Sequence, residues 1–178
     1  MISENKKEHI LTNALALIKQ SGVIHTTMDM VAAQSGVSKK TLYAYFSNKK
    51  VLLAEALEME ATLLRQELDK PVYPKMSLTD YWCRTLHIVS DRLSGYSPQL
   101  MEEFTDYFPL KHWADEQKKL VLELILKNTT NLEVRQKVEI LFRSFLALIG
   151  RSIVQKGFYF NKEALEKTVI PFYCKGVE

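Results

Sequence analysis

Residues 27 to 50, TMDMVAAQSGVSKKTLYAYFSNKK, constrain the fold more than any other part of the chain. A cap, an apolar helical repeat, a turn glycine and a second cap follow one another without a gap in these 24 residues. Gly36 lies where a left-handed residue is needed to end the first short helix. Ser38 is placed to cap the second helix, Lys39–Phe46, which is too short to be stable alone. The segment predicts a helix-turn-helix, whose second helix can enter a DNA major groove.

The exposed side of the second helix carries the kinds of side chain that recognise DNA. Lysines and hydroxyl groups reach base edges or phosphates, and a lysine beside a capped helix start can bind a phosphate. We expect base-edge contacts from Lys40 and Tyr45. Plain helix packing with solvated lysines is the alternative, and the conjunction of features favours DNA binding over it. The expected DNA-binding residues are Thr27, Ser38, Lys39, Lys40, Thr41, Tyr43, Tyr45 and Lys49.

The same segment resembles the DNA-binding signature of the tetracycline-repressor (TetR) family of bacterial regulators. The resemblance covers about the first third of the chain, and Met30 departs from it where a polar residue is common. It implies a DNA-binding domain followed by a divergent helical domain that dimerises through its last two helices and holds a small-molecule pocket. The matching residues are Thr26-Thr27, Val31-Ala32, Gly36-Val37-Ser38, Thr41-Leu42-Tyr43, Phe46, Lys49 and Leu52-Leu53.

The rest of the chain predicts helices throughout. Its 178 residues are 47% hydrophobic, with only six glycines and five prolines, and strand-like alternation is almost absent. We therefore expect an all-α fold of about nine helices. Residues 1–50 would form a helix-turn-helix DNA-binding domain, and residues 51–178 a helical effector-binding and dimerisation domain. No run of about 18 apolar residues and no signal-peptide pattern occur, so we expect a cytoplasmic protein.

Charge is distributed unevenly along the chain. Residues 1–50 hold seven lysines and three acidic residues, a net charge of +4, whereas the whole chain carries +3. The basic end is thus the end with the helix-turn-helix, as phosphate binding requires. Double-stranded DNA is the partner that this asymmetry favours.

Catalytic and metal-binding patterns are lacking. Cys83 and Cys174 stand far apart, in no CxxC arrangement, so the sequence predicts two plain thiols rather than a disulfide or a zinc site. The four histidines are scattered, and neither a phosphate loop nor a nucleophile signature is present. We expect no enzymatic activity, no cofactor and no metal.

Apolar stripes on the last two helices predict a homodimer, because a two-fold axis would bury the same face of both subunits. In the alternative, these stripes only close the core of a monomer. The expected dimerisation residues are Val138, Leu141, Phe145, Leu148, Val169 and Tyr173.

The family resemblance, together with a gathering of aromatic residues, implies a pocket for an apolar or aromatic effector. For each of these residues taken singly, core packing is the alternative role. The candidate lining residues are Trp82, His87, Phe104, Phe108, Trp113 and Phe142.

These observations predict a sequence-specific transcriptional regulator, a repressor that binds a palindromic operator as a dimer. A long helix from about Lys49 to Asp69 would move when an effector binds and would shift the spacing of the recognition helices. A helical interaction protein, or a nucleoid-type protein without a specific operator, is the alternative.

Overall fold

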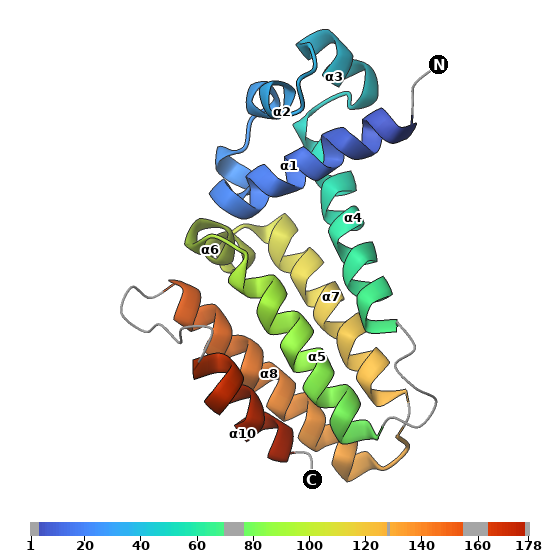
Figure 1. The fold of residues 1–178 in the computed structure, drawn as a ribbon, viewed down its shortest axis with the longest axis vertical. Coiled ribbons are helices and arrows are strands. Elements are labelled where there is room, and N and C mark those ends of the chain that lie inside the picture. The colour runs from blue at the N-terminus through green and yellow to red at the C-terminus, as the bar shows by residue number, and fades with distance from the viewer. Residues whose placement is uncertain (1–3, 70–76, 128, 155–163, 177–178) are drawn as a thin grey trace. The chain divides into compact units, whose positions relative to one another are not determined.

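The structure, a computed structural model, describes residues 4–69, 77–127, 129–154 and 164–176. All regular structure within these ranges is helical, which confirms the predicted all-α fold (Figure 1). The chain divides into two compact units, Met1–Leu64 and Arg65–Glu178. No helix in the described part of the chain is long and apolar enough to cross a membrane.

The N-terminal unit is built from three helices and the first part of a fourth. A positive φ of 81° at Gly22 interrupts the first helix near its end, a conformation that glycine adopts without steric cost. The four helices are α1 (Glu4–His25), α2 (Met28–Gln34), α3 (Lys39–Tyr45) and α4 (Lys49–Asp69).

A small apolar core holds these helices together. Leu42 of α3 and Phe46 at its end are fully buried, so seven-residue α3 is stabilised by docking rather than by its own length. Burying such a side chain stabilises the fold by about 1.5–3 kcal/mol. The other side chains of this core with 1% exposure or less include Ile10, Ala14, Ile18, Val31, Leu52, Ala56 and Ala61.

The division between the two units falls within α4, later than the predicted boundary after residue 50. Two ion pairs fasten the first part of α4 to α1. Lys7 Nζ lies 2.6 Å from a carboxylate oxygen of Glu55, and Lys19 Nζ lies 3.0 Å from one of Glu60. Because Glu60 is only 2% exposed, its pair with Lys19 is much less screened by solvent than a surface pair. The early turns of α4 therefore belong structurally to the N-terminal unit.

The C-terminal unit packs α5 against α7, α8 and α10, and α6 against α7 and α8. Pro109 and Pro171 lie in the first turns of α7 and α10, where the missing N–H of proline leaves no helical hydrogen bond unmade. The elements are α5 (Leu78–Ser94), α6 (Pro98–Asp106), α7 (Phe108–Leu126), α8 (Leu132–Val154), the π-helical turn η1 (Leu165–Val169) and α10 (Ile170–Lys175).

The packing of α10 on α5 brings the two cysteines together. The Sγ atoms of Cys83 and Cys174 are joined in a disulfide, although the residues are 91 positions apart in the sequence. The prediction of two plain thiols is therefore wrong. Spacing along the chain carries no information about this pair, because only the docking of the last helix creates it.

The predicted dimerisation stripe is largely interior. Val138 and Phe145 are fully buried, and Val169 and Tyr173 are 6% and 7% exposed, so these four side chains are core residues of the C-terminal unit. On α8 it is Ile140, two positions from Val138, that is exposed. The half-buried members of the predicted stripe are Leu141 and Leu148, and the exposed apolar side chains of α8 and α10 include Ile140 and Phe172.

Candidate nucleic-acid interface

The start of α2 is fixed by two adjacent threonines with different tasks. Thr27 is the N-cap, and its hydroxyl accepts a hydrogen bond from the backbone N–H of Met30 at 3.2 Å. Thr26 is 1% exposed, and its hydroxyl donates to the carbonyl of Gly22 at 2.7 Å. The pair thereby sets the joint between α1 and α2, and the exposed Thr27 stands at the positive end of the α2 dipole.

The turn between α2 and α3 has the hydrogen bonds of a Schellman motif. The N–H of Gly36 donates to the carbonyl of Ala33 at 3.1 Å, and that of Val37 donates to Ala32 at 3.0 Å. Gly36 has a φ of 62°, the left-handed conformation that the sequence predicted for it. This turn sets the direction in which α3 leaves α2.

Two hydroxyl groups secure the beginning of α3. Ser38 Oγ accepts a hydrogen bond from the backbone N–H of Thr41 at 3.1 Å, and it lies 2.9 Å from Thr41 Oγ1. Ser38 is therefore the N-cap, as its place before the helix predicted. Both residues order the end of α3 that carries the two lysines.

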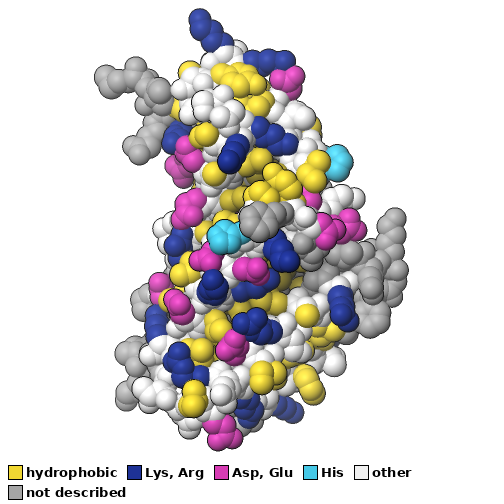
Figure 2. Space-filling model, turned by 180° about the vertical axis from the view of Figure 1, so that it is seen from behind, with side chains coloured by type: hydrophobic (Ala, Val, Ile, Leu, Met, Phe, Trp, Pro, Cys, Tyr) yellow, Lys and Arg dark blue, Asp and Glu magenta, His cyan; other side chains and the backbone are white. Residues whose placement is uncertain are grey.

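The outward face of α3 is polar and open. Lys39, Lys40 and Tyr43 are exposed, and the Tyr43 side chain is 50% exposed. Tyr45 is half-buried, with its ring centroid 6.3 Å from that of Phe46. Figure 2 shows basic side chains at the upper end of the N-terminal unit with acidic side chains beside them, and basic and acidic groups also intermix over this face of the C-terminal unit.

Lys39 is tied to α2 by an ion pair that the sequence analysis missed. Its Nζ atom lies 2.7 Å from Asp29 Oδ2, and both side chains are about two-thirds exposed. The hydrogen bond from Lys39 to Asp29, together with the carboxylate charge, raises the pKa of Lys39. Because Asp29 and Lys39 are ten positions apart, no short sequence motif contains both of them. The acidic residue in the first turn of α2 was the signal in the sequence from which a partner for Lys39 could have been inferred.

Lys49 is also engaged within the protein. Its Nζ atom donates to the carbonyl of Ile24 at 3.0 Å, near the end of α1. Asn48 caps α4 by accepting the N–H of Val51 at 3.0 Å. Lys40, by contrast, forms no ion pair with any residue that the structure describes. Of the three predicted lysines, Lys40 is thus the one whose ammonium group has no partner in the described part of the chain.

The candidate effector residues do not lie together in the structure. Two of them, Trp82 and Phe142, belong to the core of the C-terminal unit. Trp82 is fully buried, donates from Nε1 to the carbonyl of Tyr173 at 2.9 Å, and meets Phe142 edge-on with ring centroids 6.1 Å apart. Both residues therefore serve the packing of α5, α8 and α10. The side chain of His87 is exposed, away from this core.

A second aromatic group joins α6 and α7. The rings of Phe104 and Trp113 are stacked with centroids 6.0 Å apart, and Tyr96 lies 5.8 Å from Phe104. The Nε1 atom of Trp113 is buried without a hydrogen-bond partner in the described structure. A buried donor of this kind is costly unless something accepts its hydrogen. Phe108, also predicted here, is the first residue of α7, but its side chain is not among those that the structure describes.

The helix-turn-helix region matches a known family. Residues 10–56 match the sequence profile described as "Bacterial regulatory proteins, tetR family". The uncharacterized HTH-type transcriptional regulator YvaF of Bacillus subtilis (strain 168) is 38% identical over 71 residues, which cover 40% of this chain and 36% of YvaF. YhgD of the same organism is 31% identical over 88 residues, which cover 49% of this chain and 46% of YhgD. The chain thus spans less than half the length of these curated relatives.

Solved structures extend the likeness of fold to nearly the whole chain. The fatty acid degradation regulator FadR from Bacillus halodurans aligns with a TM-score of 0.71 and 16% identity, over 97% of this chain and 96% of that one. A TetR-like transcriptional regulator from Rhodococcus sp. RHA1 aligns with a TM-score of 0.65 and 19% identity, over 97% and 93%. At such identities these likenesses show a shared fold.

Proposed function

We propose that this chain is a sequence-specific DNA-binding transcriptional regulator of the TetR family, whose sequence profile its residues 10–56 match. One observation carries the proposal: α3 is capped and docked by its buried side, and its other side presents Lys40 and Tyr43 to solvent. A recognition helix needs this division between an anchored face and a polar face. We further propose that it acts in the cytoplasm and has no catalytic activity.

In the proposed complex, α3 enters the major groove. Lys40 and Tyr45 contact base edges, while Thr41, Tyr43 and Lys49 lie toward phosphates. Thr27 sits at the start of α2, where backbone N–H groups and the helix dipole also favour a phosphate. Lys39 contributes less to DNA binding than Lys40, because Asp29 already neutralises part of its charge.

The regulator is proposed to bind a palindromic operator as a homodimer, since one helix-turn-helix reads few base pairs. Half-sites would be separated by about 34–36 Å, one turn of DNA, or by a multiple of that. The proposed dimer surface comprises Ile140, Ser144 and Ala147 on α8 and Phe172 on α10. These four side chains are exposed, and the hydroxyl groups of Ser144 and Tyr173 lie 2.7 Å apart, which joins the two helices.

A small apolar or aromatic effector is proposed to bind beside Phe104 and Trp113 and to release the protein from DNA. The stacked rings supply an apolar surface, and the buried Nε1 of Trp113 would donate to an acceptor on the effector. The protein would thus act as a repressor, with α4 as the moving part. A coupling of about 1–3 kcal/mol would weaken DNA binding about 5- to 150-fold.

The test is a fluorescence-anisotropy titration of the full chain against DNA from its own upstream region and against a scrambled fragment. Lys40→Ala is compared with Lys137→Ala, which removes the same charge from an exposed position of α8. We expect a preference of about 1,000-fold or more for the native fragment. Only Lys40→Ala should reduce it.

Two outcomes would contradict the proposal. Equal, salt-sensitive binding to both fragments would favour a nucleoid-type protein, and absence of binding to a panel of genomic fragments would favour an interaction protein. The effector proposal is tested separately by fluorescence quenching of Trp113 in a Trp82→Phe background. A ligand that releases operator DNA without changing this fluorescence would place the effector elsewhere.

A further inference from the structure

The disulfide lies at a junction of the C-terminal unit. Cys83 is on α5 and Cys174 is on α10, with Cα atoms 5.3 Å apart. This separation lies within the range of about 4.4–6.8 Å that a disulfide spans. Both residues are half-buried rather than enclosed in the core. Reagents in solution can therefore approach the pair, which thiol–disulfide exchange requires.

We propose that Cys83 and Cys174 form a reversible disulfide that fastens α10 to α5 and makes operator affinity depend on thiol oxidation. The part that concerns DNA rests on the proposed function. In a reducing cytoplasm, disulfides of mesophilic proteins are rare and mostly transient, so a preformed pair at this position suits a redox sensor better than a permanent brace.

Cys174 lies on α10, a helix whose stability depends on packing against other helices. It has six residues, far fewer than an isolated helix needs for stability. Its polar ties include the hydrogen bond from Trp82 to the carbonyl of Tyr173 and the contact between the hydroxyl groups of Ser144 and Tyr173. It also carries Phe172, which is 71% exposed and lies in the proposed dimer surface. Fastening α10 would therefore order part of that surface.

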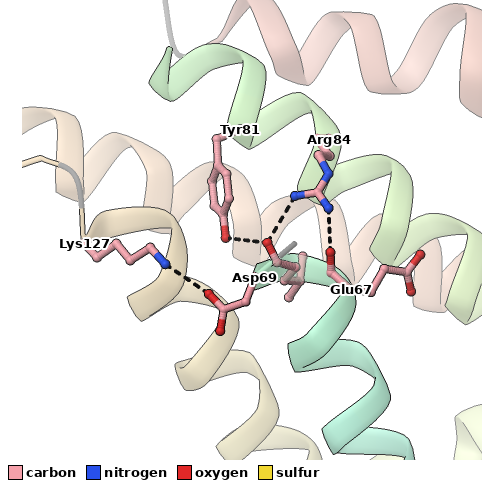
Figure 3. Close-up of polar contacts among 6 residues, drawn as sticks. Glu67, Asp69, Tyr81, Arg84 and Lys127 are labelled. Atoms are coloured by element: carbon pink, nitrogen blue, oxygen red, sulfur yellow. Dashed lines mark hydrogen bonds and ion pairs between the residues drawn. The ribbon is translucent and has the colours of Figure 1, made fainter. Parts of the chain in front are cut away.

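On the other side of the bond stands α5, which holds the end of α4. Arg84, the residue after Cys83, donates to the carbonyl of Leu68 at 3.1 Å and to that of Glu67 at 2.5 Å. Figure 3 shows this guanidinium group and the Tyr81 hydroxyl converging on the last turn of α4. The carbonyls at a helix C-terminus lack helical partners, so these donors complete the helix. One turn of α5 thus contacts both α10 and the proposed moving helix.

The proposed oxidant of the two cysteines is a low-molecular-weight disulfide. The thiolate of one cysteine attacks it, forms a mixed disulfide and releases one small thiolate. The second cysteine, as a thiolate, attacks the protein sulfur of the mixed disulfide and releases the second small thiolate. Two protein thiols are oxidised to one disulfide and the small disulfide is reduced to two thiols, which take up the two protons.

The first experiment treats the reduced full chain with oxidised glutathione and measures intact mass and amide hydrogen exchange. We expect a mass two hydrogens lower without a glutathione adduct, exchange in α10 slowed about tenfold or more, and reversal by excess reduced glutathione. Cys83→Ser and Cys174→Ser should each form a mixed adduct instead. If the treated wild-type chain kept two free thiols or carried stable glutathione adducts, the proposal that the two cysteines form a reversible disulfide would be overturned.

The second experiment measures operator affinity of the same samples. Because oxidation orders α10 at the proposed dimer surface, we expect the oxidised wild-type chain to bind at least about fivefold more tightly, and Cys83→Ser, whose glutathione adduct does not fasten α10 to α5, to gain no affinity. Unchanged or weaker binding by the cross-linked chain would overturn the link to DNA. If neither form binds any operator, the proposed function fails, whereas mass and hydrogen exchange still decide whether the reversible pair exists.

Discussion

At the scale of single residues, similar lysines near the recognition helix have different surroundings. Lys39 pairs with Asp29, Lys49 donates to the carbonyl of Ile24, and Lys40 has no ion pair in the described structure. Exposed ion pairs add little to stability. The main effect of the pair is therefore that Asp29 partly neutralises the positive charge of Lys39. DNA must compete for that charge, whereas Lys40 is available to it.

Substitution of Asp29 tests this competition. Asp29→Asn should release the Lys39 ammonium group for a phosphate, so DNA affinity should rise and the slope of log affinity against log salt should steepen by up to about one unit. The raised pKa keeps Lys39 protonated through neutral and mildly alkaline pH, so deprotonation of Lys39 would break the pair only as pH rises beyond the ordinary lysine range. A change of pH near neutrality therefore cannot replace the substitution.

Anisotropy titrations at several salt concentrations provide the measurement. Glu133→Gln, which removes one negative charge from the exposed start of α8, is the matched control. A salt slope that is equal in Asp29→Asn and wild type would show that Lys39 does not reach DNA even when released.

At the scale of elements, the turn between α2 and α3 depends on backbone conformation alone. A Cβ atom added at Gly36 would meet nothing within 4 Å, yet the φ of 62° is strained for residues other than glycine. Gly36→Ala should lower the free energy of unfolding by about 1–2 kcal/mol. Gly36→Asn should lower it less, because asparagine adopts this conformation more readily. Urea unfolding followed by circular dichroism measures both, and equal stability of all three chains would refute the strain argument.

The end of α4 offers a second prediction at this scale. Arg84→Met removes two hydrogen bonds to carbonyls in the last turn of α4 and should destabilise the C-terminal unit by about 1.5–3 kcal/mol. Lys127→Met breaks only an exposed pair with Asp69 and should cost less than about 1 kcal/mol. Hydrogen exchange of residues 65–69 should quicken in Arg84→Met alone. Similar exchange in both variants would show that the guanidinium group does not hold this helix end.

At the scale of the whole molecule, the features that could be predicted from the sequence are those set by residues close together along the chain. The caps and the turn glycine act within three or four positions, so α2, α3 and their connection could be located from the chain itself. The exposure of an apolar side chain depends instead on which helix packs against it. Val138 and Ile140 are two positions apart on α8, yet they are 0% and 67% exposed. The disulfide between Cys83 and Cys174 escaped prediction for the same reason.

The proposed dimer gives the last prediction. Burying an isoleucine or a phenylalanine side chain is worth about 1.5–3 kcal/mol, and a two-fold interface contains each residue twice. Ile140→Glu or Phe172→Glu would therefore remove about 3–6 kcal/mol and add two buried charges. We expect monomers in sedimentation velocity at concentrations where the wild-type chain is dimeric.

Operator affinity connects this change of assembly to function. A monomer keeps its helix-turn-helix intact, so its binding to a single half-site should be unchanged while the advantage of the full palindrome disappears. Leu63→Glu is the matched control, because Leu63 is an exposed apolar residue of the N-terminal unit. If both α8 and α10 variants remain dimeric, the subunits must meet through another surface. The tighter binding expected of the oxidised chain would then need a route other than the ordering of Phe172.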